Sequence, residues 1–125
     1  MAVRILVGQQ VSVASARSLT ARLVHLHGRE VFFYLANLYP IHAVSWHDRE
    51  TAPDLTEARR LTSHAFLAGL DRELLGHGPV EAIEAQVAET LSRTGGRGLI
   101  LAPSCVIPTT TPPEHLRAVV MALRG

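Results

Sequence analysis

Short apolar runs alternate with amphipathic stretches along most of this chain. The runs are four to six residues long, which is typical of buried β-strands. The amphipathic stretches repeat apolar side chains at steps of three and four residues, so these side chains share one face of a helix. The pattern predicts four strands, at residues 23–26, 41–46, 65–69 and 98–102.

An expected helix follows each expected strand. Asp54 and Glu57 have the spacing of a helix capping box, and so do Thr111 and Glu114. A glycine-containing loop is expected before Pro79, which is suited to the first turn of a helix. The pattern predicts helices over residues 30–39, 55–61, 79–94 and 112–123.

This strict alternation predicts an α/β fold with a parallel sheet and helical crossovers. A (β/α)8 TIM barrel takes about 250 residues. The 125 residues of this chain therefore have the length of half a barrel. We expect four βα units over residues 21–125, a (βα)4 half-barrel. Residues 1–20 are less regular, and we expect them to pack on this domain as an N-terminal extension.

Composition and charge narrow the class of protein. The chain is 47% hydrophobic and 18% charged, with a net charge of +1, so neither a disordered segment nor a nucleic-acid or anionic-membrane partner is expected. The lone cysteine, Cys105, excludes an internal disulfide and predicts a cytoplasmic location. No run approaches the ~18 apolar residues of a membrane helix, and no signal peptide is expected.

Polar residues follow the expected strands, at the end where parallel α/β proteins bind ligands. Strand one ends in His25 and His27, and strand four is followed by Cys105. Because the carboxyl ends of parallel strands share one rim, we expect these groups to gather there. The candidate catalytic residues on this rim are His47, Asp48, Asp71 and Ser104.

Three of the rim residues have the chemistry of a metal site. His25 and His27 are two positions apart, so on a strand they point to the same face. With the Cys105 thiolate they would form a His2Cys set with one open position, the pattern of a catalytic zinc ion. Such an ion would bind and activate a thiol or a water molecule. Alternatively, the histidines pair by chance and Cys105 is a small buried hydrophobe.

The C-terminal segment GGRGLILAPSCVIPTTTPPEHLRA, residues 95–118, resembles the end of the uroporphyrinogen decarboxylase superfamily. Its Thr-Pro-Pro-Glu stretch carries most of this similarity. Upstream, residues 24–28 and 43–48 look like the family's fifth and sixth strands, and residues 69–75 look like the loop after the seventh. Arg72 stands where the family usually has proline. The resemblance covers residues 21–125 and implies the C-terminal half of a (β/α)8 barrel.

The superfamily resemblance implies one of two chemistries. Its decarboxylases remove carboxylates from a tetrapyrrole without a cofactor, and its corrinoid-dependent methyltransferases use zinc to activate a thiol. The methyltransferase ligand motifs match His25, His27 in place of a cysteine, and Cys105. Ser104 falls where the decarboxylases have histidine, so the resemblance implies the zinc branch more than the decarboxylase branch. The arginine and aspartate that clamp the decarboxylase substrate belong mainly to the N-terminal half of the barrel, for which this chain has no counterpart.

Four βα units alone leave two sheet edges and an apolar interior open, and a two-fold homodimer would close them into eight strands. The first hypothesis is therefore an enzyme or enzyme remnant of this superfamily with a zinc-type site for thiol or methyl transfer. The second is a non-catalytic half-barrel that assembles with itself or binds a tetrapyrrole, corrinoid or thiol ligand. The third is a truncated or engineered half of an active parent.

Overall fold

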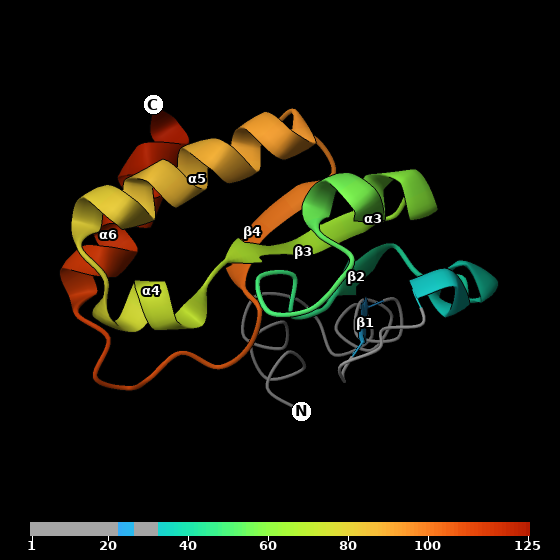
Figure 1. Cartoon of the computed structure of the whole chain (residues 1–125), viewed down its shortest axis with the longest axis horizontal. Helices are drawn as coiled ribbons and strands as arrows, with labels where there is room; N and C mark the ends of the chain where they lie inside the picture. Colours follow the sequence, from blue (N-terminus) through green and yellow to red (C-terminus); the bar gives the residue numbers. More distant parts are fainter. Residues whose placement is uncertain (1–22, 27–32) are drawn as a thin grey trace, which may run out of the picture.

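A computed structural model of the chain describes residues 23–26 and 33–125. These residues form a four-stranded sheet in the order β1-β2-β3-β4, and every neighbouring pair is parallel (Figure 1). This confirms the predicted parallel α/β class and is the architecture of a partial (β/α)8 barrel. The strands are β1 (Leu23–His25), β2 (Ala43–Ser45), β3 (Ala65–Leu70) and β4 (Leu99–Pro103).

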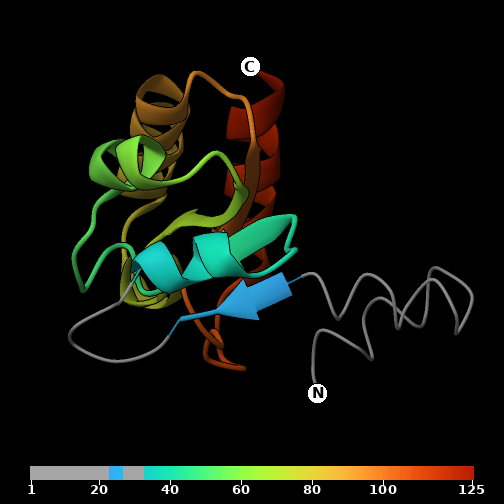
Figure 2. The same ribbon diagram turned by 90° about the vertical axis from the view of Figure 1, so that its right-hand side faces the viewer.

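Helical segments connect the strands and supply the second layer. Helix α5 packs on β3, and α6 lies beside α5, as the two ribbon views show (Figures 1 and 2). Among the described residues, no helix is long and apolar enough to cross a membrane. The helical segments are η1 (Phe33–Leu38), α3 (Leu55–Leu61), α4 (Arg72–His77), α5 (Val80–Thr94) and α6 (Pro113–Arg124).

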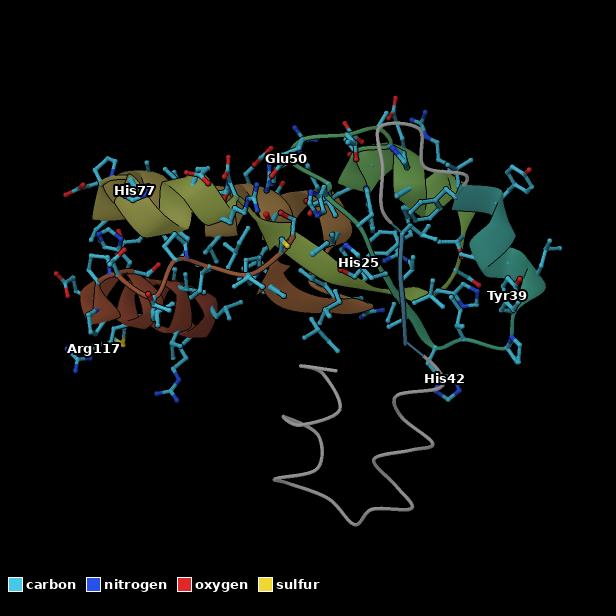
Figure 3. All side chains as sticks on the ribbon, turned by 90° about the horizontal axis from the view of Figure 1, so that it is seen from below. His25, Tyr39, His42, Glu50, His77 and Arg117 are labelled. Carbon is cyan, nitrogen blue, oxygen red and sulfur yellow. The ribbon has the colours of Figure 1, made fainter. Side chains whose placement is uncertain are left out.

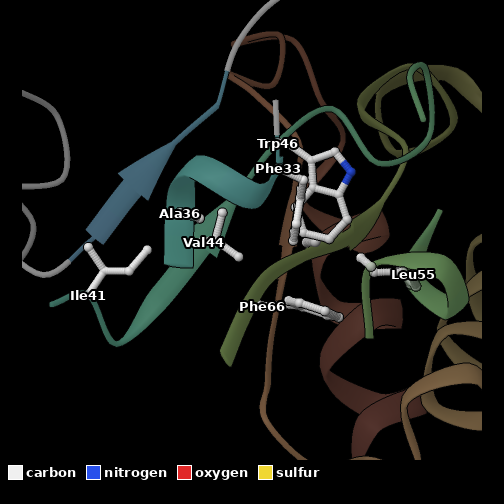
Figure 4. Packing of buried hydrophobic residues seen from close by; sticks show 9 residues of the cluster. Phe33, Ala36, Ile41, Val44, Trp46, Leu55 and Phe66 are labelled. Carbon is white, nitrogen blue, oxygen red and sulfur yellow. The ribbon is translucent and has the colours of Figure 1, made fainter. Parts of the chain in front are cut away.

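An aromatic cluster fills the space between the sheet and the helices (Figure 4). The Trp46 and Phe66 rings are both fully buried and meet edge to face, with their centroids 5.1 Å apart. The Phe33 ring meets Trp46 in the same way at 4.8 Å. The Trp46 indole donates a 2.8 Å hydrogen bond to the Pro53 carbonyl, so the buried N–H has a partner. Trp46 therefore anchors the segment that follows β2.

A second cluster lies under α5 and α6. Its buried members are Leu70 at the end of β3, Leu75 on α4, Ile83 and Val87 on α5, and Val119 on α6. The Ile83–Val87 spacing is the helical periodicity that predicted α5 from the sequence. Since this cluster includes Leu70 at the carboxyl end of β3, it fixes the position of this strand end and of the segment that follows it.

Three local predictions were wrong. The first expected helix is a 3-10 helix over Phe33–Leu38; the preceding residues 27–32 lie outside the described part. Residues 72–77 form helix α4 rather than a loop, because the Asp71 side chain accepts the N–H groups of Glu73 and Leu74 and caps a new helix.

The third wrong prediction is the capping box at Thr111 and Glu114. Helix α6 starts after Pro112, and no side chain caps it. A residue before proline is held in an extended conformation, so both Thr111 and Pro112 stay outside the helix. The box at Asp54 and Glu57 is confirmed, with reciprocal hydrogen bonds of 2.8 and 3.1 Å.

Candidate functional site

The carboxyl ends of the four strands meet at one edge of the sheet. His25 ends β1, the segment from Trp46 to Glu50 follows β2, and Ser104 follows β4. In Figure 3, His25 and Glu50 lie near the middle of the molecule, while His77 and Arg117 lie out on α4 and α6. We call this edge with its loops the rim.

Two histidines connect the first two strands at the rim. His25 is exposed and lies opposite Ser45 in the β1–β2 register. Its Nδ1 atom is 3.0 Å from the Ser45 hydroxyl, in hydrogen-bonding contact. The ring centroids of His25 and His47 are 5.5 Å apart, and His47 Nδ1 lies 3.4 Å from a Glu50 carboxylate oxygen. A series of contacts at the rim therefore joins Ser45 to His25, His25 to His47, and His47 to Glu50.

Asp48 is the most perturbed carboxyl of the rim. The residue is 6% exposed, and its Oδ1 atom accepts the Gly69 N–H at 3.3 Å. Its Oδ2 atom forms an ion pair with Arg49 at 3.5 Å but accepts no hydrogen bond from the described residues. Burial raises the pKa of Asp48 to about 6, against the lowering effects of the Gly69 N–H and the Arg49 charge. Near neutral pH this carboxyl can therefore both give and take a proton.

Arg49 joins the rim loop to β3 and α5. Its Nε and Nη2 atoms donate to the Gly69 carbonyl at 3.2 and 2.8 Å, and Nη2 also donates to the Thr90 hydroxyl at 2.6 Å. The Thr90 hydroxyl itself donates to the Gly69 carbonyl at 2.9 Å. A further bond of 2.8 Å joins Arg49 Nη1 to Glu89. The Gly69 carbonyl thus accepts three hydrogen bonds.

Position 69 requires glycine for two reasons. Its φ angle is +108°, which other residues rarely adopt. A Cβ atom there would also lie 2.5 Å from the Thr90 Cγ2 atom and 2.9 Å from Leu101 Cδ1. Arg49, Ser45 and this glycine are rim residues that the sequence pattern did not predict. Arg49 stands in a run of charged residues that is typical of a solvated loop, and glycine at a strand end was the one available signal.

The other candidate catalytic residues differ in their surroundings. Asp71 caps helix α4, so its carboxylate already has backbone partners. Ser104 is 2% exposed, its N–H donates to the Leu70 carbonyl at 3.3 Å, and its hydroxyl has no hydrogen-bond partner among the described residues. A buried hydroxyl without a hydrogen bond costs free energy, so the Ser104 hydroxyl is suited to form a hydrogen bond with a polar group of a ligand.

The expected metal ligands are only partly described. His25 ends β1 and Cys105 follows β4, and these two outer strands of the described sheet are separated by roughly 14 Å at normal strand spacing. Cys105 is a half-buried free thiol, and His27 lies outside the described residues. Within the described part, no three His, Cys, Asp or Glu side chains are grouped so as to hold a metal ion. A metal site therefore depends on His27.

Parallel βα units in this order define the class as a partial α/β barrel, a fold in which ligands bind at the carboxyl ends of the strands. A family model described as uroporphyrinogen decarboxylase matches residues 9–125. The chain belongs to the uroporphyrinogen decarboxylase family, as the sequence resemblance implied. A search of curated proteins found no match to the chain.

The raised pKa of Asp48 predicts a particular pH dependence of stability. The folded protein binds this proton more tightly than the unfolded chain does, whose Asp pKa is 3.8. The stabilisation is complete below the unfolded pKa and is lost as the pH rises through about 6. Between pH 4 and 7, we expect the wild-type protein to lose about 2 kcal/mol of unfolding free energy relative to Asp48→Asn, measured by urea denaturation.

Asp54→Asn is the matched control, since hydrogen bonds from the α3 backbone lower the pKa of the exposed Asp54 carboxyl. Its contribution has the opposite sign, so wild type gains stability relative to Asp54→Asn as the pH rises through the acidic range. Identical pH profiles for wild type and Asp48→Asn would show that the Asp48 carboxyl has an ordinary pKa.

Proposed function

We propose that this chain supplies the C-terminal half of a decarboxylase-type (β/α)8 barrel, and that its rim transfers a proton to a carbon that loses a carboxylate. The observation that carries the proposal is the Asp48 carboxyl, buried at the rim with a pKa of about 6 and with no hydrogen bond at Oδ2 from the described residues. Family membership supplies the class of reaction.

Decarboxylation requires such a group. When the carbon–carboxylate bond breaks, carbon dioxide leaves and the bonding electrons stay on carbon, which must then take a proton. A carboxyl with a pKa just below neutral is protonated in a useful fraction of molecules. Asp48 is assigned the proton donation, and the neighbouring Arg49 charge stabilises the carboxylate that remains.

The neighbouring polar groups suit an anionic substrate. The Ser104 hydroxyl is buried without a partner in the described residues, so it has a hydrogen bond to offer a carboxylate oxygen. The His25 and His47 rings lie 5.5 Å apart where β1 and β2 end, and an imidazole N–H can donate a hydrogen bond to a carboxylate. A substrate that bears several carboxylates, such as a tetrapyrrole, fits this arrangement.

A second candidate is the zinc-type thiol site at His25, His27 and Cys105. It is favoured by the contact between His25 Nδ1 and the Ser45 hydroxyl, because metal-ligating histidines typically fix their second ring nitrogen in this way. When bound, zinc would hold a substrate thiol and lower its pKa. Ser45 would then orient the His25 ring, and the thiolate would come from Cys105 of a second copy, whose β4 would lie beside β1 in a closed dimer.

We further propose that a second copy of the chain completes the barrel. In the described sheet, β1 and β4 each have one unpaired edge, and parallel sheets are normally covered and closed. On β4, Ile100 is 55% exposed. Helix α6 has a groove lined by Leu116, Arg117, Val120 and Met121. A homodimer would bury this surface, with or without a catalytic function.

The proton-transfer proposal predicts a large effect of Asp48→Asn on turnover. Purified protein is supplied with a carboxylated tetrapyrrole, and the released carbon dioxide is measured. We expect kcat to fall roughly 100-fold or more, because asparagine cannot donate the proton, and KM to change little. Asp54→Asn should stay within about twofold of wild type. Wild-type kcat in Asp48→Asn, or no carbon dioxide from the wild-type protein, would contradict the proposal.

Native mass spectrometry tests the zinc and assembly proposals together. The expected species is a dimer with roughly one zinc ion per chain. Cys105→Ala should stay dimeric and lose the zinc, whereas the control His42→Ala, at an exposed position away from the proposed ligands, should keep both. Zinc retained in Cys105→Ala would exclude the thiol site, and a purely monomeric wild-type protein would exclude the dimer.

A further inference from the structure

The Gly69 backbone is held on both sides of its Cα atom by neighbouring residues of the rim loop. Its N–H donates to the Asp48 carboxylate, and its carbonyl accepts two hydrogen bonds from the Arg49 guanidinium. Two consecutive side chains of one loop, Asp48 and Arg49, thus bind the N–H and the carbonyl of one residue on the adjacent strand. These hydrogen bonds fix both the position and the direction of each side chain.

We propose that Arg49 is the positioning residue of the rim, because its guanidinium fixes the Gly69 carbonyl and thereby holds in place the residue whose N–H donates to the Asp48 carboxyl. This inference deepens the proposed function and depends on it for its catalytic meaning. In the proposed reaction, Arg49 does not contact the substrate. It acts through Gly69 and through its charge, 3.5 Å from Asp48 Oδ2.

The surroundings of Arg49 show why this side chain can hold the peptide rigidly. All three guanidinium nitrogens are engaged, with Gly69, Thr90 and Glu89 as partners, and the side chain is only 15% exposed. A planar guanidinium can donate to these three acceptors at once, whereas the single ammonium group of a lysine cannot reach all of them in the same geometry. The contacts join the loop after β2 to β3 and α5, so they define one geometry for the rim.

Glu89 is itself fixed from the other side. Its second carboxylate oxygen forms an ion pair with Arg93 Nε at 2.7 Å, one helical turn along α5. Arg49 is therefore paired with a carboxylate whose position is already set, which restrains Nη1. The Thr90 hydroxyl restrains Nη2 in the same way while bonding to the Gly69 carbonyl.

Several groups act on Asp48, and they set the direction of the expected effect. Burial and the Asp71 carboxylate raise its pKa, while the N–H of Gly69, the charge of Arg49 and the backbone N–H of Asp48 lower it. Trp46 holds the loop independently of Arg49, through its buried ring and the hydrogen bond to Pro53. Loss of Arg49 should therefore leave Asp48 buried and remove two of the lowering effects.

The test is a carboxyl carbon-13 NMR titration of protein labelled at aspartate. Asp48→Asn assigns the Asp48 resonance, because the chain has just two other aspartates, Asp54 and Asp71. In Arg49→Gln, we expect the Asp48 midpoint to rise by about one pH unit relative to wild type. In Arg49→Lys, which keeps the charge but not the planar guanidinium, the rise should be smaller.

Arg59→Gln is the matched control. Arg59 also bonds to backbone carbonyls, those of His64 and Gly98, but at the opposite ends of β3 and β4. The Arg59→Gln variant should have a lower free energy of unfolding but an unchanged Asp48 midpoint. This result would distinguish a positioning role of Arg49 from a general structural role. Circular dichroism checks the folding of each variant, and Arg49→Lys keeps the test usable if Arg49→Gln does not fold.

An Asp48 midpoint that is unchanged or lower in the folded Arg49 variants would overturn the inference. Its failure is distinct from that of the proposed function. A shifted midpoint together with full turnover in Asp48→Asn would leave Arg49 as the positioning residue and reject proton transfer by Asp48. An unshifted midpoint with lost turnover in Asp48→Asn would do the reverse.

Discussion

The rim depends on one constraint, the close contact between the Gly69 backbone at the end of β3 and the loop that follows β2. The carbonyl of this glycine accepts three hydrogen bonds from two side chains, and its N–H binds the Asp48 carboxylate. A buried backbone N–H or carbonyl needs such partners, since leaving either group unpaired costs free energy. Because the partners come from the loop after β2 and from α5, pairing the backbone of this one residue brings β3, that loop and α5 together.

The same contact links stability to chemistry. Asp48 lies near Gly69 in a site with little solvent, where burial makes its charged form unfavourable. The protein thus holds a carboxyl that would be more stable neutral, next to an arginine that favours the charge. Opposing effects of this kind are what place a pKa near neutrality in active sites. The rim residues are costly to hold in this arrangement, which is typical of a functional site rather than of a surface loop.

The fold followed from the sequence to a large extent. Regular apolar periodicity identified the strands and most of the helices, and the Asp54–Glu57 pair located the start of α3. Helix α4 was missed because it is short and depends on one capping side chain, Asp71. The false capping box at Thr111 shows the opposite error, since the consecutive prolines exclude Thr111 from the helix.

The site was predicted only as a set of residues at the strand ends. His47, Asp48 and Ser104 do lie there, but the sequence held no sign that Asp48 is buried or that Ser104 lacks a partner among the described residues. Arg49 was missed entirely, because its role depends on carbonyl and hydroxyl groups 20 and 41 residues away. Long-range pairing of this type leaves no local pattern in a sequence.

Replacing Gly69 by alanine tests most directly whether this glycine holds the rim together. The comparison is the free energy of unfolding of Gly69→Ala and Gly96→Ala, since both glycines have positive φ but only Gly69 lacks room for a Cβ atom. Gly96→Ala should cost about 1–2 kcal/mol for the backbone alone. The constraint predicts that Gly69→Ala costs at least about 2 kcal/mol more, because Thr90 and Leu101 must move. Equal losses in the two variants would contradict it.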